Sequence, residues 1–321
     1  MNLREYINEV LSAGLFSDEV HGVTYNHSFT DRNGVRHEDG YKPKDKNSLK
    51  KLLSVLIKER GPKGDFNDID ISEIDDLSML FSNNFKFNGD ISGWDTSGVY
   101  DMSRMFFRAS SFNGDITRWD TSRVEYMDYM FYEARSFNQD LSRWDMSKVV
   151  NTSYMFSNAT SFNQPIGKWD TRNMLMVSGM FREATSFNQP IGVWDTSNVV
   201  DMSVMFYRAD SFNQDLSNWN TSKVVNTSYM FSKATSFNQP LGAWDTSGVE
   251  NMMSMFEGAD SFNQDLSQWD TSKVKFMNNM FEGAHSFDQD ISGWNTKSVK
   301  DSRDMFNHCP IKDEHKPTGL R

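Results

Sequence analysis

The chain has 321 residues, of which 37% are hydrophobic and 14% are aromatic, and its formal net charge is −11. The aromatic share is high enough to build a core, so disorder is not expected over most of the chain. The acidic excess disfavours nucleic acid and anionic membranes as partners, because both attract clustered Lys and Arg. No stretch approaches 18 consecutive apolar residues, so no membrane insertion is expected. The single cysteine, Cys309, excludes an intrachain disulfide.

The first 65 residues precede any repeat and are expected to form an N-terminal cap or a docking region. An opening helix is predicted by an apolar stripe made of Leu3, Ile7, Val10 and Leu11. The Asp-Arg-Asn-Gly segment at residues 31–34 predicts a hairpin turn. A second apolar stripe between Leu49 and Ile57 predicts another helix, closed by Gly61 and Pro62, that covers the first repeat.

All nine tryptophans of the chain are spaced by 25 residues. They are Trp94, Trp119, Trp144, Trp169, Trp194, Trp219, Trp244, Trp269 and Trp294. A fixed period between about 20 and 50 residues marks a solenoid or a similar array. With one degenerate repeat in which Ile69 replaces Trp, the period predicts about ten repeats over residues 66–309. Residues 310–321 are short and polar, and they predict a frayed C-terminal tail.

Each repeat is predicted to hold one short helix and one short parallel strand. The helix is indicated by apolar residues at i, i+3, i+6, i+7 and i+10: Val124, Met127, Met130, Phe131 and Ala134. Residues 120–122 would supply its N-cap oxygens. The second half of residues 112–119 is predicted to be a strand, stacked on its equivalents about 4.8 Å apart. The fold class is therefore an α/β repeat solenoid.

Two polar columns are assigned structural roles. Asp residues such as Asp115 are followed two positions later by Ser or Thr, and in other repeats Pro followed by Gly stands in their place, as in Pro165. Both pairs of residues favour a tight backbone turn. Asn113 and its equivalents flank the recurring Phe and are expected to bond the backbone of the next repeat, because polar groups near a core need partners. A ligand-binding role is the alternative.

No catalytic motif is found, so neither an enzyme nor a cofactor is expected. The three histidines at His21, His27 and His37 could hold a metal near the hairpin, but their spacing matches no standard site. Cys309 and His308 could form a nucleophile pair, although adjacent side chains rarely face each other. The Trp-Asp-Thr-Ser ladder could be a calcium-binding or ice-binding array, but helix capping explains the Asp and Thr more simply.

Two columns vary between repeats and are expected to point outward. One reads Arg104, Tyr129, Tyr154, Gly179, Val204 and Tyr229, and its neighbour reads Phe107, Tyr132, Ser157, Arg182, Tyr207 and Ser232. Tyr mixed with Ser and Arg is typical of recognition surfaces. The alternative is that the tyrosines pack against neighbouring repeats. The candidate partner-binding residues are Arg104, Phe107, Tyr129, Tyr132, Tyr154, Arg182, Tyr207 and Tyr229.

The repeat Phe-Asn-Gln-Asp-Leu-Ser-x-Trp-Asp-Thr-Ser-x-Val-x-x-Met-x-x-Met-Phe resembles that of the BspA-like leucine-rich-repeat surface proteins, over residues 66–306. The resemblance implies a right-handed leucine-rich-repeat-type superhelix, a cell-surface location, and attachment to a protein or glycan partner. No signal peptide, lipid-attachment cysteine or sorting tail is recognised in the sequence. A structural or host-attachment component of a phage or virus particle is therefore kept as the alternative function, and oligomerisation through the N-terminal region would favour it.

Overall fold

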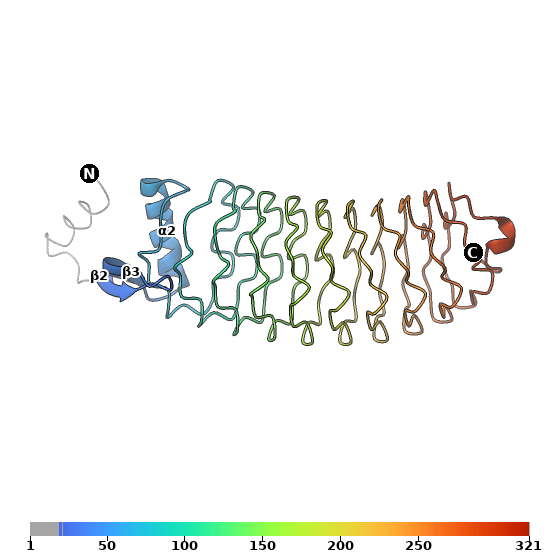
Figure 1. The fold of residues 1–321 in the computed structure, drawn as a ribbon, viewed down its shortest axis with the longest axis horizontal. Helices are drawn as coiled ribbons and strands as arrows, with labels where there is room; N and C mark the ends of the chain where they lie inside the picture. Colours follow the sequence, from blue (N-terminus) through green and yellow to red (C-terminus); the bar gives the residue numbers. More distant parts are fainter. Residues whose placement is uncertain (1–18, 21, 321) are drawn as a thin grey trace.

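The structure is a computed structural model that describes residues 19–20 and 22–320. The predicted opening helix lies outside these residues. The elements of the described part are, in order, β1 (Glu19–Val20), β2 (Val23–Thr30), β3 (Arg36–Pro43), α2 (Lys46–Arg60) and the 3-10 helix η1 (Asp313–His315). All five lie near the two ends of the chain, and the repeats occupy the space between (Figure 1).

The three strands form an antiparallel sheet in the order β1-β2-β3. The turn predicted at residues 31–34 joins β2 to β3 and is confirmed. The Gly34 N–H donates to the Asp31 oxygen at 2.9 Å, and Gly34 has a φ of 83°. A positive φ of this kind favours glycine, which lacks the Cβ that would clash. The Arg32 N–H donates to the Gly93 oxygen at 2.9 Å, so this turn contacts the repeats.

Helix α2 covers the first repeat, as predicted. Asp45 caps its N-terminus in a capping box with Ser48, and Gly61 follows its last residue. The leucines of its apolar stripe are buried in the same core cluster as the repeats. The Lys46 ammonium lies 2.8 Å from the Asp76 carboxylate of the first repeat. The helix thus closes an apolar end that would otherwise face water.

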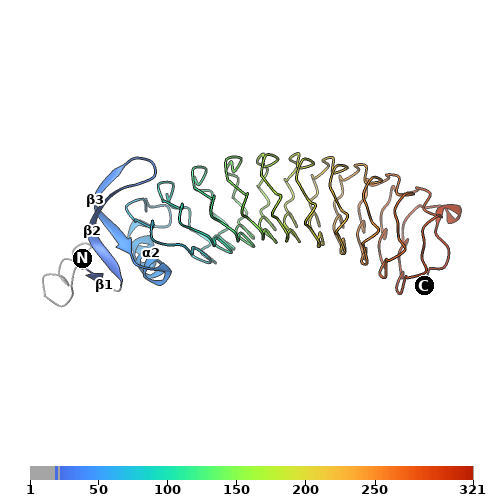
Figure 2. The ribbon, with the colours of Figure 1, turned by 90° about the horizontal axis from the view of Figure 1, so that it is seen from below.

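Residues 66–309 form a tandem array with a period of 25 residues. Successive repeats lie side by side along the long axis of the molecule, and the row is gently curved (Figures 1 and 2). A line of isolated parallel bridges joins equivalent positions from Asp76 to Asp301, each bridge linking residues 25 apart. The backbone is therefore paired between repeats at one recurring position, with a further bridge between Asp65 and Asp90 at the start of the array.

The predicted three-turn helix at residues 124–134 is wrong. Alternate N–H groups in this segment donate to carbonyl oxygens of the next repeat instead of closing helical turns. Met127 donates to the Asn151 oxygen and Phe131 to the Met155 oxygen, both at 2.9 Å. The intervening groups close three-residue turns, as when Met130 donates to Met127. A helix needs each N–H for the carbonyl four residues earlier, so this bonding pattern excludes one.

The strand predicted in residues 112–119 is also wrong. In this segment Phe112 and Trp119 donate their N–H groups to carbonyls three residues earlier, at 2.9 and 3.2 Å. Recurring parallel pairing lies at another column, which contains Asp101 and Tyr126, whereas the column of Asp115 has a bridge between Asp65 and Asp90 at the N-terminal end of the array. The apolar residues near Trp119 place their side chains in the core, and their backbone does not form a strand.

The core is a continuous stack of rings along the array. Trp119 is 3% exposed and its indole N–H donates to the Ile91 oxygen at 3.2 Å. Phe106 lies 3.8 Å from Phe112 in its own repeat and 5.6 Å from Phe131 in the next, measured between ring centroids. These contacts recur from repeat to repeat, so burial couples each repeat mainly to its two neighbours.

Both polar columns have the structural roles predicted for them. The Asp115 carboxylate accepts from the Thr117 N–H at 2.9 Å, which closes an Asx turn. The Asn113 side-chain oxygen accepts from the Asn138 N–H at 2.9 Å and from the Gln139 side-chain amide at 3.1 Å. Equivalent asparagines continue this ladder along the array, and each joins its repeat to the next.

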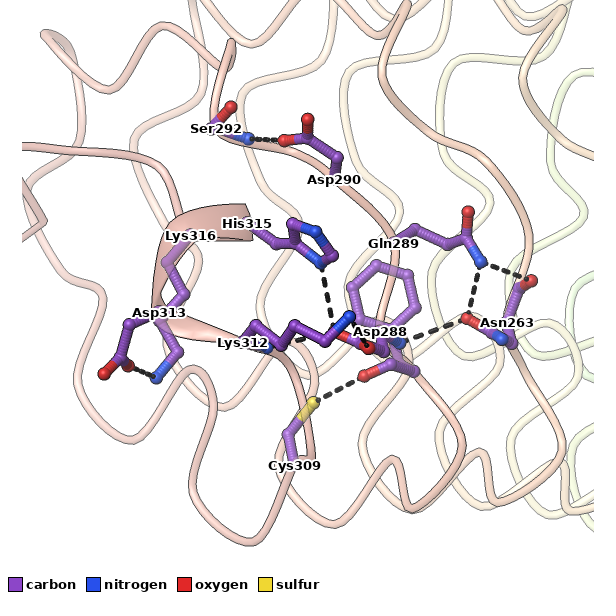
Figure 3. Close-up of polar contacts among 11 residues, drawn as sticks. Asn263, Asp288, Gln289, Asp290, Ser292, Cys309, Lys312, Asp313, His315 and Lys316 are labelled. Atoms are coloured by element: carbon purple, nitrogen blue, oxygen red, sulfur yellow. Dashed lines mark hydrogen bonds and ion pairs between the residues drawn. The ribbon is translucent and has the colours of Figure 1, made fainter.

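The predicted frayed tail is wrong, because residues 310–320 fold back as a C-terminal cap (Figure 3). Asp288 occupies the last ladder position, where the other repeats have Asn. Its carboxylate accepts from the Lys312 N–H and the His315 ring, both at 3.0 Å, and forms an ion pair with the Lys312 ammonium at 3.2 Å. Ile311 is 5% exposed and belongs to the core cluster. One apolar side chain and a charged anchor therefore hold this segment in place.

Candidate partner-binding surface

The first variable column lies at an unusual backbone conformation. Tyr129, Tyr154 and Val204 have φ values of 55°, 56° and 52°, and the equivalent position holds Gly179 in another repeat. A positive φ is uncommon for any residue with a Cβ and most costly for a β-branched one. Because nearly every repeat adopts it, we assign it to the hydrogen bonding between repeats and not to a specialised site.

Five of the candidate residues gather into one cluster, which we call the aromatic patch: Arg104, Phe107, Tyr129, Tyr132 and Tyr154. Tyr129 and Tyr154 stack with ring centroids 4.9 Å apart and an interplanar angle of 9°. Phe107 and Tyr132 stack at 4.9 Å and 11°. The Arg104 guanidinium lies 5.1 Å from the centre of the Tyr129 ring. The cluster spans three successive repeats.

The patch combines packing with exposure. Its four rings are half-buried against one another, while Arg104 is exposed. Burial raises the pKa of the Tyr129 phenol, the neighbouring Tyr154 adds to this increase, and Arg104 opposes it. The phenol oxygens of Tyr129, Tyr132 and Tyr154 form no hydrogen bond with another described residue. The tyrosines therefore pack between repeats, as the alternative interpretation predicted, and their hydroxyls keep hydrogen-bonding capacity.

Gly179 sets the far boundary of the patch. A Cβ at this position would lie 2.4 Å from the Tyr154 ring, a separation that side chains do not tolerate. The absence of a side chain lets the Tyr154 ring lie over the next repeat. In the neighbouring column Ser157 follows Tyr132 and is fully buried, so the second stack also ends there.

The three remaining candidates form a separate, looser set. The Arg182 guanidinium lies 5.3 Å from the centre of the Tyr207 ring, and Tyr207 meets Tyr229 edge-on at 6.5 Å. Arg182 also pairs with the Glu183 carboxylate at 2.7 Å. The eight candidates thus divide into two groups, and the first is the larger and more closely packed.

The described histidines of the hairpin are engaged in local contacts. His27 bonds the Asp70 carboxylate at 2.8 Å and His37 bonds Asp31 at 3.1 Å, while His21 lies outside the described residues. Within residues 19–20 and 22–320, no three His, Cys, Asp or Glu side chains gather as a metal site would require.

The Cys309 thiol is not arranged as a nucleophile. It donates to the Phe287 oxygen at 3.4 Å (Figure 3), and burial raises its pKa. A raised pKa leaves the thiol protonated, whereas nucleophilic attack needs the thiolate. Its place beside the C-terminal cap gives it a packing role.

The period, the ladders and the two end caps define this chain as a tandem-repeat protein. The family model described as "Mycoplasma protein of unknown function, DUF285" matches residues 52–166, 141–241 and 212–316. The matches cover most of the chain, and the chain belongs to this family. No curated protein matches it. In the part of the chain that the structure describes, no helix is long and apolar enough to cross a membrane.

Proposed function

We propose that this chain is a non-enzymatic binding scaffold that attaches to a protein or glycan partner through the aromatic patch. In this proposal the array is a right-handed solenoid of leucine-rich-repeat type, similar to the BspA-like surface proteins. The 25-residue period and the family match support the comparison with those proteins. A rigid row of repeats suits this role because it holds side chains from several repeats in one fixed arrangement.

The observation that carries the proposal is the combination of stacked rings, one exposed guanidinium and three free phenol groups. Tyrosine gives a large contact area at a low cost in side-chain entropy. Here the stacking of Tyr129 on Tyr154 restricts the rings before any partner arrives. Restricting side chains in advance improves affinity, because less entropy is lost on binding. Tyr and Arg also dominate binding energy at protein interfaces.

The test must separate binding from packing, since the rings also join repeats. The variant R104A/Y129F/Y132F/Y154F keeps every ring and removes only the guanidinium and the three hydroxyls. The control variant R172A/Y100F makes the same kinds of change at two exposed positions outside the patch. Both variants are expected to keep the circular dichroism spectrum and the melting temperature of the wild type.

The readout is attachment of fluorescently labelled protein to cultured epithelial cells and to immobilised extracellular-matrix proteins. We expect attachment to weaken at least about tenfold in the patch variant, as loss of interface anchors predicts, and to stay unchanged in the control. Equal attachment of the patch variant and the wild type would overturn the proposal. So would a wild-type protein that attaches to none of these surfaces.

A further inference from the structure

A second surface feature lies outside the aromatic patch. It is a groove of about 530 Å³ that crosses five successive repeats. One wall carries the residues of a positive-φ column: Asn158, Glu183, Arg208, Lys233 and Gly258. The other wall carries Thr160, Thr185, Asp210, Thr235 and Asp260. We call this feature the polar groove. Its volume falls in the range of small-molecule binding sites, roughly 300–1,000 Å³.

The groove is elongated along the array because its lining residues come from five successive repeats. Adjacent repeats are bonded through their backbone beside it, as when Arg208 donates its N–H to the Ser232 oxygen at 2.9 Å. Strands paired in this way lie about 4.8 Å apart, so five repeats give a length of roughly 19 Å. A ligand that fills the groove is therefore a chain of several units.

Several polar groups in the groove have hydrogen-bonding capacity to spare. Thr160, Thr185 and Thr235 are half-buried, and their hydroxyls form no hydrogen bond with another described residue. Arg208 and Asp210 are exposed, and neither forms a salt bridge or a side-chain hydrogen bond within the described part of the chain. Although Asp210 is exposed, partial desolvation by its neighbours raises the pKa of its carboxyl, and the Arg208 charge opposes this increase.

At and beyond the ends of the groove, equivalent polar groups are already bonded within the protein. At the C-terminal end the Asp260 carboxylate is engaged by the His285 ring at 2.8 Å. Beyond the N-terminal end, the equivalent Ser110 hydroxyl donates to the Phe85 oxygen at 3.3 Å. The uncommitted groups thus run from Thr160 to Thr235, with the charged pair Arg208 and Asp210 in the middle repeat.

The chemistry of the walls favours a neutral, hydroxyl-rich ligand. None of the ten lining residues carries an aliphatic or aromatic hydrocarbon side chain, so the groove lacks the apolar pockets that anchor a peptide side chain. Its charges nearly cancel, with two cations facing three carboxylates. A polyanion would face those carboxylates, and a polycation would face Arg208 and Lys233. Sugar hydroxyls both donate and accept, which matches the mixture of threonine hydroxyls, guanidinium, carboxylate and amide.

We propose that the polar groove binds a neutral oligosaccharide that runs across the repeats, with Arg208 and Asp210 as its central contacts. This site is separate from the aromatic patch and lies on other columns of the array. The inference therefore goes beyond the proposed function and can fail or succeed independently of it.

The experiment uses the full chain and neutral hexasaccharides built from glucose, mannose, galactose or N-acetylglucosamine, with a heparin hexasaccharide as the charged comparison. Binding is measured on a glycan array and then by isothermal titration calorimetry. The variant R208A/D210A removes the two central contacts and leaves the net charge unchanged. The control R108A/E133A removes the Arg108–Glu133 ion pair of 3.5 Å, which lies outside the groove, and is also neutral in net charge.

We expect at least one neutral hexasaccharide to bind, with an association constant about tenfold lower in R208A/D210A, as the loss of charged hydrogen bonds predicts. The control and R104A/Y129F/Y132F/Y154F are expected to bind it as the wild type does. The proposal is overturned if no neutral hexasaccharide binds, if only heparin binds, or if R208A/D210A keeps its affinity. Loss of sugar binding in the patch variant alone would move the site to the aromatic patch.

Discussion

The indole N–H of Trp194 donates to the backbone oxygen of Ile166, 28 residues earlier in the chain, at 3.1 Å. The Trp194 ring is 5% exposed and stacks on Trp169 with the centroids 6.1 Å apart. Each tryptophan of the array makes the same bond to the repeat before it. The tryptophan column therefore joins repeats both by packing and by a directed hydrogen bond.

Replacing Trp194 by alanine is expected to lower the free energy of unfolding by about 3–5 kcal/mol, through the cavity it leaves and the loss of one of the two hydrogen bonds to the Ile166 carbonyl, which keeps the Trp169 N–H. The loss should spread to the repeats on both sides. Trp294→Ala lies in the last repeat, with a full repeat on one side only, and should do less harm. Urea unfolding followed by circular dichroism compares the two variants, and equal midpoints would contradict this expectation.

The sequence predicts the period, the buried columns and α2, because each depends on side chains whose burial is visible as spacing. It does not predict the backbone path within a repeat. The apolar spacing from Val124 to Ala134 fits one face of a helix, yet the N–H groups of Met127 and Phe131 bond the next repeat. A single sequence does not reveal where N–H groups are directed when two backbone paths bury the same side chains.

One signal for the true path was present in the sequence. Gly179, Gly258 and Gly283 stand in two columns four residues apart, at positions where a helix would favour other residues. Asn83 and Asn158 occupy the second of these columns, and asparagine tolerates a positive φ. All five positions have positive φ in the structure. In the C-terminal segment the equivalent signal was Ile311, an apolar residue that a frayed tail would have no reason to contain.

The candidate residues were chosen because their columns vary between repeats, and the structure places five of the eight in the aromatic patch. What it left open was whether the tyrosines pack or bind. Stacking distances such as 4.9 Å between Tyr129 and Tyr154 depend on how closely the repeats approach. The polar groove was missed, because its walls combine positions such as Arg208 and Asp210 whose lack of partners is evident only in three dimensions.

The asparagine ladder gives a second prediction. The Asn188 side-chain oxygen accepts from the Asn213 N–H at 3.0 Å and from the Gln214 amide at 2.8 Å. Asn188→Ala removes this acceptor and should cost about 1–3 kcal/mol, because a half-buried N–H loses its partner. Asn188→Asp keeps an acceptor oxygen and should cost less at neutral pH. Chemical denaturation ranks the three proteins, and an alanine variant as stable as the wild type would show that water replaces the ladder.

The C-terminal cap should weaken in acid. Hydrogen bonds from the Lys312 backbone N–H, and next the Lys312 and His315 side chains, hold the pKa of Asp288 below its ordinary value (Figure 3). A group with a lowered folded-state pKa contributes stability above its unfolded pKa of about 3.9, and this is lost as the pH falls through the folded value. The protection factor of residues 311–318 against hydrogen exchange, taken relative to the unfolded chain at the same pH, should therefore fall below about pH 4.

The matched variant for the cap is Asp288→Asn, which restores the ladder residue of the other repeats and removes the charge. Its protection factor over residues 311–318 should be lower than that of the wild type at pH 7 and should change less in acid. Other aspartates also have lowered pKa values, so the difference between the two proteins isolates Asp288. Parallel pH profiles would exclude Asp288 as the anchor of the cap.

Metal removal should leave the array unchanged. Asp115 and its equivalents accept backbone N–H groups in Asx turns, such as that of Thr117 at 2.9 Å, and these bonds stabilise the repeat without a cation. The melting temperature in EDTA is therefore expected to equal that in calcium. A fall of many degrees that calcium alone reverses would identify the aspartate ladder as a metal array.

The last prediction concerns a hydroxyl that the fold leaves unused. The Ser157 oxygen is buried and has no hydrogen-bond partner, and the same holds for Ser232 three repeats later. A hydroxyl in this state has lost its bonds to water without replacement, which costs about 1–3 kcal/mol on mutational scales. Ser157→Ala removes that cost and leaves the backbone bond from the Ser157 N–H to the Tyr154 oxygen in place.

The serine variants should therefore be as stable as the wild type or more stable, with a melting temperature that is equal or higher for both Ser157→Ala and Ser232→Ala. Ser178→Ala is the control, because the Ser178 hydroxyl bonds the Ser203 hydroxyl at 3.1 Å and its loss should lower stability. Differential scanning calorimetry measures all three. If Ser157→Ala melted well below the wild type, the hydroxyl would have to bond an ordered water inside the array, and the end of the Tyr132 stack would be hydrated rather than dry.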